Sequence, residues 1–452
     1  MARIAADGIS VGVTNFCGML EGLEIERGGR RIRPLHRAPW VGHSEELPED
    51  PVPHHVVLEG DFFCAPFGQT DEPGVAAHGW PANGTWRDLG TATAADGAVT
   101  MRLELEEKVS GATVTKEVTL RPGHPVVYQR HLLTGGSGAV PIAHHAMIHV
   151  PGGARLSFST KDFGATPEMP QETDPARGVS ILAATAADGA VTMRLELEEK
   201  VSGATVTKEV TLRPGHPVVY QRHLLTGGSA PCRLRTTRCD PCSRRRTSAS
   251  AKDFGATPEI PQETDPARGV SILASPQRFG SLAEVALADG SKRDMRSYPW
   301  ADGHEDFLSL IDPKDAVTGW SAAVAAADGF VFFAVKDARM LCQTSLWMSN
   351  GGRFFAPWSS RHKAVLGIEE GTTFFGNGRL ASAAENDLTR QGYRTAVPLG
   401  GEVVVRYALG AIPVPEGWRE VADVAIGDDG LTITDVGGGR ETVGFHAGFL
   451  EN

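Results

Sequence analysis

The sequence predicts an all-β fold, a large antiparallel β-sandwich with its chemistry on the loops. Three segments of alternating or nearly alternating apolar and polar residues follow one another at 99–106, 112–120 and 126–133, and short stretches of Gly, Ser or Pro separate them. Such alternation puts apolar side chains on one face of a strand, so these segments predict a meander of half-buried strands. The 53 glycines and 29 prolines are typical of a chain rich in turns.

The rest of the chain continues the pattern of short strands. Further strands are expected over 330–335, 364–368, 402–407 and 431–434, where apolar and β-branched residues are frequent. Long amphipathic helices are not evident in the sequence, and the best short candidate is 380–391.

Two stretches of the chain occur twice. Residues 92–137 recur letter for letter as residues 184–229, and residues 161–183 recur as residues 252–274 with a single difference. The repeats of a solenoid diverge in sequence, so an unchanged copy indicates an internal duplication and not a repeat architecture.

The residues between the two matches are related through the reading frame. Suitable codons for Gly138–Pro141, read one base later, encode the sequence found at Ala230–Arg233. Three cysteines of the second copy, Cys232, Cys239 and Cys242, are then products of the shifted frame. Because a structural zinc site takes four ligands at suitable spacing, we expect no metal there.

The duplication sets the expected domain organisation. We expect a single domain over 1–452, in which 184–274 is a surplus copy of about 92–183, partly frame-shifted at 230–251. Removing the surplus leaves 361 residues (452 minus 91) as the chain to interpret. The shifted frame also erased the histidines of 138–157 from the second copy, so the first copy must supply any site built on them. The alternative is that the duplicated chain does not fold productively.

Composition and charge limit the class of partner. The formal net charge is -11, and nucleic acids and anionic membranes bind surfaces rich in Lys and Arg, so neither is expected as a partner. The first residues lack the apolar core of a signal peptide and no run reaches about 18 apolar residues, which favours a cytoplasmic protein. Six cysteines are too few for a disulfide framework. A small neutral ligand fits best, and the oligomeric state is left open.

Two neighbouring motifs carry a resemblance to a known family. Residues 60–68 read GDFFCAPFG and residues 78–86 read HGWPANGTW. Together they resemble the aldose 1-epimerase (galactose mutarotase-like) superfamily, in particular its hexose-phosphate epimerase branch. The resemblance implies a large antiparallel supersandwich and a place for His78 in the active site. Asn83 and Gly84 stand where that branch has a basic residue, so phosphate recognition is not implied.

Two later segments resemble the strands that carry the family's catalytic pair. Residues 142–150, IAHHAMIHV, resemble the strand with the catalytic histidine, which implies that role for His145. Residues 365–373, VLGIEEGTT, resemble the late strand that ends in a catalytic glutamate, which implies that role for Glu369. Because side chains alternate along a strand, His144 and His145 face opposite sides, as do the two adjacent glutamates. The alternative for His145 is a hydrogen-bonded structural histidine.

Several residues are expected to bind the sugar. The segment 300–307 resembles the family's Asp-His substrate-binding segment, which implies Asp306. Shortly before Glu369 lie flat aromatic rings and hydrogen-bond donors, which suit the face and the hydroxyls of a sugar. The expected substrate-binding residues are Asp306, Trp80, Asn350, Arg353 and Trp358. For Trp80, as for Phe62, Phe63 and Trp86, the alternative is a place in the hydrophobic core.

The resemblance implies an aldose 1-epimerase-like isomerase that interconverts sugar anomers by ring opening at C1. Ring opening removes a proton from the anomeric hydroxyl and gives one to the ring oxygen, so the site needs one base and one acid. Glu369 would serve as the base and His145 as the acid, with His78 holding developing charge or orienting a hydroxyl. No metal or organic cofactor is required. The alternative is a non-catalytic carbohydrate-binding protein of the same fold, because sandwich folds host many functions.

Overall fold

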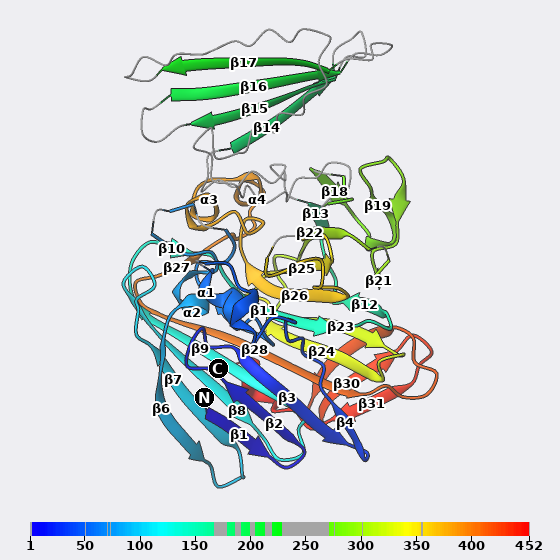
Figure 1. Ribbon diagram of the computed structural model, residues 1–452. Coiled ribbons are helices and arrows are strands. Elements are labelled where there is room, and N and C mark those ends of the chain that lie inside the picture. The colour runs from blue at the N-terminus through cyan, green and yellow to red at the C-terminus, as the bar shows by residue number, and fades with distance from the viewer. Residues whose placement is uncertain are drawn as a thin grey trace. The chain divides into compact units, whose positions relative to one another are not determined.

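The computed structural model contains two compact units, whose strands are labelled in Figure 1. The first unit comprises Met1–Glu168 together with Pro266–Asn452, and the second comprises Met169–Asp265. In the first unit the structure describes residues 2–49, 51–69, 71–72, 74–166, 271–274, 276–300, 302–353 and 356–451. In the second unit it describes the backbones of four strands, 179–185, 191–198, 204–212 and 219–227.

Two large antiparallel sheets form the body of the first unit (Figure 1). The nine-stranded sheet has the spatial order β21 (Ser297–Tyr298), β12 (Ala154–Phe158), β23 (Thr318–Ala325), β24 (Phe330–Asp337), β28 (Glu402–Pro413), β9 (Val126–Gly135), β8 (Ala112–Leu120), β7 (Val99–Leu105) and β6 (Trp86–Thr93). The seven-stranded sheet has the order β18 (Gln277–Phe279), β13 (Phe163–Thr166), β22 (His304–Ile311), β25 (Gln343–Asn350), β26 (Val365–Thr372), β11 (Ile142–His149) and β5 (Phe63–Cys64). This confirms the predicted all-β antiparallel class.

Smaller sheets and short helices complete the first unit. One smaller sheet has the order β1 (Ala2–Ala6), β2 (Ile9–Val13), β3 (Leu20–Arg27) and β4 (Arg30–Ile32), and another has the order β29 (Val421–Gly427), β30 (Gly430–Asp435) and β31 (Arg440–Val443). Two further sheets have two strands each: β10 (Ala139–Val140) with β27 (Val397–Pro398), and β19 (Val285–Ala286) with β20 (Lys292–Arg293). The α-helices are α1 (Pro53–Val56), α2 (Gly79–Asn83), α3 (Arg379–Ala383) and α4 (Asp387–Arg390), and 3-10 turns lie at Ser44–Glu46, Leu282–Glu284 and Ala447–Leu450. Among the described residues these helices have five residues or fewer, so none is long enough to cross a membrane.

The main hydrophobic core lies between the two large sheets. From β11, the alternate residues Ile142, Ala146 and Ile148 are fully buried in a cluster that also contains Tyr407 and Leu409 of β28. Burying one isoleucine side chain contributes about 1.5–3 kcal/mol of stability relative to leaving it in water. The period of two therefore commits every second residue of β11 to the core and directs the others to the opposite, outer face of the seven-stranded sheet.

A second apolar layer covers that outer face. Ala143 and Met147 of β11 and Trp347 of β25 cluster there with Trp40 and Phe62 from the loops that follow β4. The candidate catalytic residues lie within this layer, as described below.

The strands expected from the alternating pattern are present. Each of the seven expected segments corresponds to a strand of the first unit, in order β7, β8, β9, β24, β26, β28 and β30. Several continue beyond the predicted bounds, and β28 is the longest of them with 12 residues.

The prediction of one helix over 380–391 is wrong, because two helices share this segment. The side chain of Asn386 accepts hydrogen bonds from the backbone N–H groups of Leu388 (3.1 Å) and Thr389 (3.0 Å). The Thr389 hydroxyl in turn accepts from the Asn386 N–H at 2.8 Å, which completes a capping box. A capping box satisfies the free N–H groups of a helix start, so α4 begins after Asn386 and is not a continuation of α3.

The second unit repeats the meander of the first. Its sheet has the order β14 (Val179–Thr185), β15 (Val191–Glu198), β16 (Ala204–Leu212) and β17 (Val219–Gly227). Val99 pairs with Leu120 in the first unit and Val191 pairs with Leu212 in the second, so the same register recurs at the offset of 92 residues. Identical sequences thus adopt identical strand pairing. The surplus-copy interpretation of 184–274 stays a prediction, and residues 230–251, with Cys232, Cys239 and Cys242, lie outside the described residues.

Candidate active site

Two adjacent strands place a histidine and a glutamate side by side. β11 and β26 pair antiparallel with His145 directly opposite Glu369. Residues opposite each other in an antiparallel pair direct their side chains to the same face, and Nε2 of His145 lies 3.0 Å from Oε1 of Glu369. Their neighbours His144 and Glu370 face the core, where Glu370 pairs with the buried Lys336 of β24 at 2.5 Å.

Gly367 provides the space that the Glu369 carboxyl group occupies. The two residues share one face of β26, and a Cβ atom on Gly367 would lie 2.9 Å from Oε1 of Glu369. It would also lie 3.1 Å from Cβ of Trp347 on the neighbouring strand. A larger residue at 367 would therefore force the Glu369 carboxyl group or the Trp347 side chain to shift.

Phe62 and His78 fix the histidine ring from two sides. The Phe62 and His145 rings stack at 4.5 Å with an interplanar angle of 17°, and the His145 N–H donates to the Phe62 carbonyl at 2.9 Å. The His78 ring meets the His145 ring nearly at right angles at 5.3 Å. Sγ of Cys64 lies 3.5 Å from Nδ1 of His78, and burial raises the pKa of this thiol well above its usual range. Cys64 is therefore a neutral partner for His78.

The turn that carries His78 is tight. His78 has a φ of 64° and the following Gly79 a φ of 69°, and a Cβ atom on Gly79 would lie 2.1 Å from the carbonyl oxygen of Ala65. Asn83 braces this turn through Nδ2, which donates to two of its backbone carbonyls at 2.7 Å. Its Oδ1 atom lies 2.8 Å from Nδ1 of His54. Asn83 thus has a structural role at the position where the related branch has a basic residue.

Burial determines the protonation of the His145–Glu369 pair. Glu369 is 2% exposed and His145 is 5% exposed. Burial raises the pKa of Glu369 well above its usual range, and the Arg353 guanidinium opposes this shift in part. Burial, with a contribution from His54, lowers the pKa of His145 to about 3. Burial thus disfavours both charged forms, the carboxylate of Glu369 and the imidazolium of His145, and transfer of a proton from a neutral Glu369 to His145 would give a carboxylate and an imidazolium.

Arg353, Trp347 and Glu305 form a wall beside the pair. Nε1 of Trp347 donates to Oε1 of Glu305 at 2.5 Å, and Nε of Arg353 lies 3.3 Å from the same oxygen. The guanidinium carbon lies 4.4 Å from the ring centre of Trp358 and 5.3 Å from that of Trp347, within the range of cation–π attraction. The Trp347 ring is 5.5 Å from that of His145. The wall thus presents an aromatic face and hydrogen-bonding groups next to the pair.

Asp306 is not part of this wall. Its carboxylate accepts hydrogen bonds from the Ser271 hydroxyl at 2.7 Å and the Ile272 N–H at 3.0 Å, and it contacts Nδ1 of His304 at 2.7 Å. Since side chains alternate along β22, the acid on the outer face is its neighbour Glu305, which sequence reasoning did not select. Which of the two acids faces outward depends on the pairing of β22 with β25.

The other predicted binding residues lie in different environments, and not all of them lie beside the His145–Glu369 pair. Asn350 has a structural role, because its Oδ1 accepts the Ala364 N–H at 2.8 Å and its Nδ2 donates to Asp302 at 3.4 Å. Trp80 lies at the surface in α2, with 37% of the residue exposed. Trp358 is buried against Trp40, with ring centres 4.7 Å apart, and the Arg353 guanidinium carbon lies 4.4 Å from its ring centre. The structure therefore brings together His78, His145, Glu369, Arg353 and Trp358.

The pair is nearly closed to solvent. A cavity of about 440 Å³ on this unit is lined mainly by basic residues, and neither Glu369 nor His145 lines it. A sugar ring needs far more contact with the pair than exposures of 2% and 5% allow. Binding therefore requires the covering side chains to move. Among the wall residues, the Arg353 side chain is the most accessible, at 27%.

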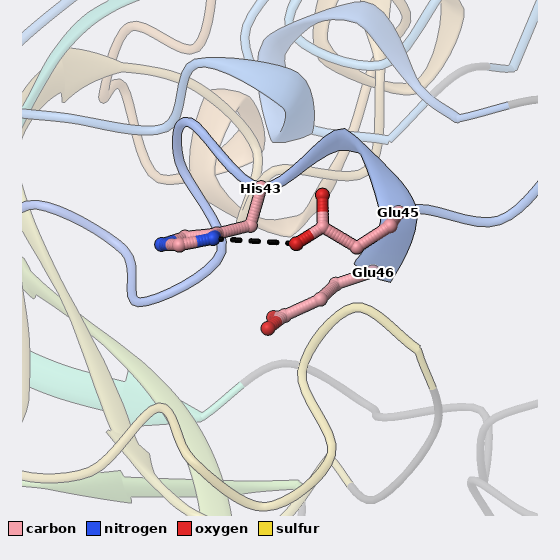
Figure 2. A group of neighbouring side chains, drawn as sticks. All are labelled: His43, Glu45 and Glu46. Atoms are coloured by element: carbon pink, nitrogen blue, oxygen red, sulfur yellow. Dashed lines mark ion pairs between the residues drawn. The ribbon is translucent and has the colours of Figure 1, made fainter.

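A separate surface group has the spacing of metal ligands. His43, Glu45 and Glu46 lie together at the surface, as Figure 2 shows, with Nδ1 of His43 3.4 Å from Oε1 of Glu45. Glu46 already forms an ion pair with Arg361, and the hydrogen bond from Arg361 lowers the pKa of Glu46. Exposed acidic groups of this kind are common without an ion, and none of the three residues contributes to the pair.

Comparison with known proteins gives structural similarity alone. No protein-family profile and no curated protein sequence matches the chain. A provisionally assigned aldose 1-epimerase from Escherichia coli K12 matches with a TM-score of 0.43 and 9% identity, over 91% of this chain and 98% of the other. A galactose mutarotase related enzyme from Lactobacillus acidophilus matches with a TM-score of 0.41 and 9% identity, over 92% and 98%. A provisionally assigned aldose 1-epimerase from Klebsiella pneumoniae matches with a TM-score of 0.43 and 14% identity, over 90% and 77%. Since these TM-scores lie below 0.5, the function is argued from the residues of the site.

Proposed function

We propose that the protein is an aldose 1-epimerase-like isomerase that interconverts the α and β anomers of a small-molecule sugar in the cytoplasm. One observation carries the proposal: His145 and Glu369 lie opposite each other on adjacent strands, 3.0 Å apart and almost fully buried. Anomer interconversion needs one group that takes a proton and one that gives a proton, both within reach of the two oxygens on C1. A carboxyl group and an imidazole ring in direct contact can supply these two groups.

The proposed reaction uses the two groups in turn. Glu369, as the carboxylate, takes the proton of the anomeric hydroxyl while His145, as the imidazolium, gives its proton to the ring oxygen. The bond between C1 and the ring oxygen breaks and an aldehyde forms at C1. Rotation about the C1–C2 bond presents the other face of the aldehyde, and the reverse transfers close the ring. No net proton is gained or lost, and no cofactor takes part in these steps.

Three surrounding residues bear on the charge and contacts that the reaction needs. The Arg353 guanidinium favours ionised Glu369, because its charge lowers the pKa of that carboxyl group against the effect of burial. His78 is neutral, since burial lowers its pKa well below the usual range, so it can accept or donate a hydrogen bond to a hydroxyl without adding charge. Trp347 offers an aromatic face for the apolar side of the sugar.

A non-catalytic carbohydrate-binding protein of the same fold is the second candidate. A binding protein needs no contact between the sugar and the Glu369 carboxyl group, which is only 2% exposed in the described conformation. The two candidates differ in what Glu369 does. For a catalyst the carboxyl group must exchange protons, whereas for a binding protein an amide of the same shape serves equally well.

Polarimetry of freshly dissolved α-glucose and α-galactose tests the proposal. The wild-type protein should accelerate the change in optical rotation of at least one sugar above the rate in buffer, and Glu369→Gln should lose this acceleration while sugar binding, measured by calorimetry, persists. Folded wild-type protein that binds a sugar without accelerating the change would support the binding protein and refute the isomerase.

A further inference from the structure

A second cluster of polar side chains lies directly behind the catalytic strand. Nδ1 of His144 lies 3.1 Å from Oδ2 of Asp61, and Nε2 of Gln129 donates to the same oxygen at 2.6 Å. All three residues are fully buried. Burial of polar groups is costly unless they are hydrogen-bonded, and the proposed reaction does not use any of them directly.

The cluster holds the backbone that carries the catalytic histidine. Asp61 immediately precedes Phe62, which stacks on His145 and accepts its N–H. His144 immediately precedes His145 and stacks on Tyr407 of the opposite sheet at 4.3 Å. One segment and one strand therefore present Phe62 and His145 on the outer face, and Asp61 and His144 on the inner face. A displacement of the inner pair would move the outer pair with it.

Charge reinforces this geometry. Burial acts to raise the pKa of Asp61, but His144, Lys116 and Gln129 outweigh it and lower the pKa, so Asp61 carries a negative charge. Burial lowers the pKa of His144, so its neutral ring donates Nδ1–H to Asp61. Burial and His54 lower the pKa of His145, and the Asp61 charge is the largest influence in the opposite direction. Arg353 and His54 repel a proton on His145, whereas Asp61 attracts one.

We propose that Asp61 and His144, fastened by Gln129, are positioning residues that fix the orientation of the His145 ring. This inference rests on the proposed function of the same site. The three residues do not contact the sugar. Their effect is on the rate of the proton transfers, because a catalytic group held about 1 Å from its working position loses about a hundredfold in rate.

The duplication supplies a matched control for Gln129. Gln129 lies on β9 in the segment that occurs twice, and its counterpart on β17 is Gln221. The two glutamines have the same neighbours in sequence and the same register, because Gln129 pairs with Val118 and Gln221 pairs with Val210. The same substitution can therefore be made in the segment next to Asp61 and in the copy.

The test compares Asp61→Asn, Gln129→Leu and Gln221→Leu in the full chain, with the fold of each verified by circular dichroism. The first two should lower kcat for mutarotation about tenfold to a hundredfold with KM nearly unchanged, and Gln221→Leu should match the wild type. Asp61→Asn has nearly the same shape as the native residue, so it separates charge from packing. In Asp61→Asn the ring ¹⁵N signals of His145 should titrate at lower pH than in the wild type.

The outcomes separate this inference from the proposed function. If Asp61→Asn and Gln129→Leu keep wild-type kcat and an unchanged His145 titration, the positioning role is overturned. A Gln221→Leu effect as large as that of Gln129→Leu would also overturn it. If the wild type shows no turnover but Asp61→Asn still shifts the His145 titration, the proposed function fails and the positioning role stands.

Discussion

Gly367→Ala is the substitution with the most direct geometric consequence for the catalytic pair. The added Cβ would lie 2.9 Å from Oε1 of Glu369, whereas ordinary contacts begin at 3.4 Å, so the carboxyl oxygen must retreat by about 0.5 Å (3.4 minus 2.9). Because this oxygen lies 3.0 Å from Nε2 of His145, within the usual hydrogen-bond range of about 2.7–3.2 Å, a shift of this size alters the geometry of the contact. Proton exchange within the pair would then be impaired.

The expected result is a loss of rate with a preserved fold. We expect kcat for mutarotation to fall about tenfold, because a displacement of about 1 Å costs a catalytic group about a hundredfold and the shift here is about half as large. Overpacking near Trp347 should reduce the free energy of unfolding by about 1–3 kcal/mol, measured by urea denaturation. Gly401→Ala is the control, since a Cβ there meets nothing within 4 Å. Wild-type kcat in a folded Gly367→Ala protein would refute the geometric reasoning.

Three further predictions distinguish the neighbouring residues and the pH dependence. Asp306→Leu should cost about 1–3 kcal/mol of stability by leaving the buried His304 ring and the Ile272 N–H without an acceptor, with KM unchanged; a raised KM with full stability would instead place Asp306 in the site. Glu305→Gln should raise KM, because Arg353 loses its charged partner, and an unchanged KM would argue against this wall as a sugar contact. Folding raises the pKa of Glu369, so the contribution of this group to stability is complete below the unfolded pKa of about 4.5 and is lost as pH rises through the folded pKa. The melting temperature of the wild type should therefore fall with pH in a way that Glu369→Gln does not show. Parallel profiles of melting temperature against pH for the two proteins would contradict the raised pKa.

Local sequence pattern was sufficient for the strands and for part of the site. The alternation in 142–149 correctly separates His145 from His144, because one face of β11 must enter the core. The adjacent glutamates also face opposite sides of β26, and Glu370 forms an ion pair with the buried Lys336 on the core side. The pattern could not predict that His145 lies opposite Glu369, since the two are more than 200 residues apart in the sequence and their pairing depends on the whole sheet.

The two adjacent acids of β22 show where local pattern is insufficient, and the role of Asp306 stays a prediction. A shift of one residue exchanges the faces of a strand, and β22 has acidic residues at both 305 and 306. The choice between them depends on the register with β25, where Glu305 pairs with Ser349 and Asp306 pairs with Met348. The split between α3 and α4 is a different case, because the capping residue Asn386 was present in the sequence as a possible helix start.

Exchange NMR on an equilibrated solution of the α and β anomers tests the central claim most directly. With wild-type protein, cross-peaks between the two anomeric protons should appear at mixing times at which the sugar alone gives none. Glu369→Gln should abolish them, because the pair then lacks the proton acceptor that ring opening requires. Cross-peaks of equal intensity with Glu369→Gln, or none with folded wild-type protein that binds the sugar, would contradict the account.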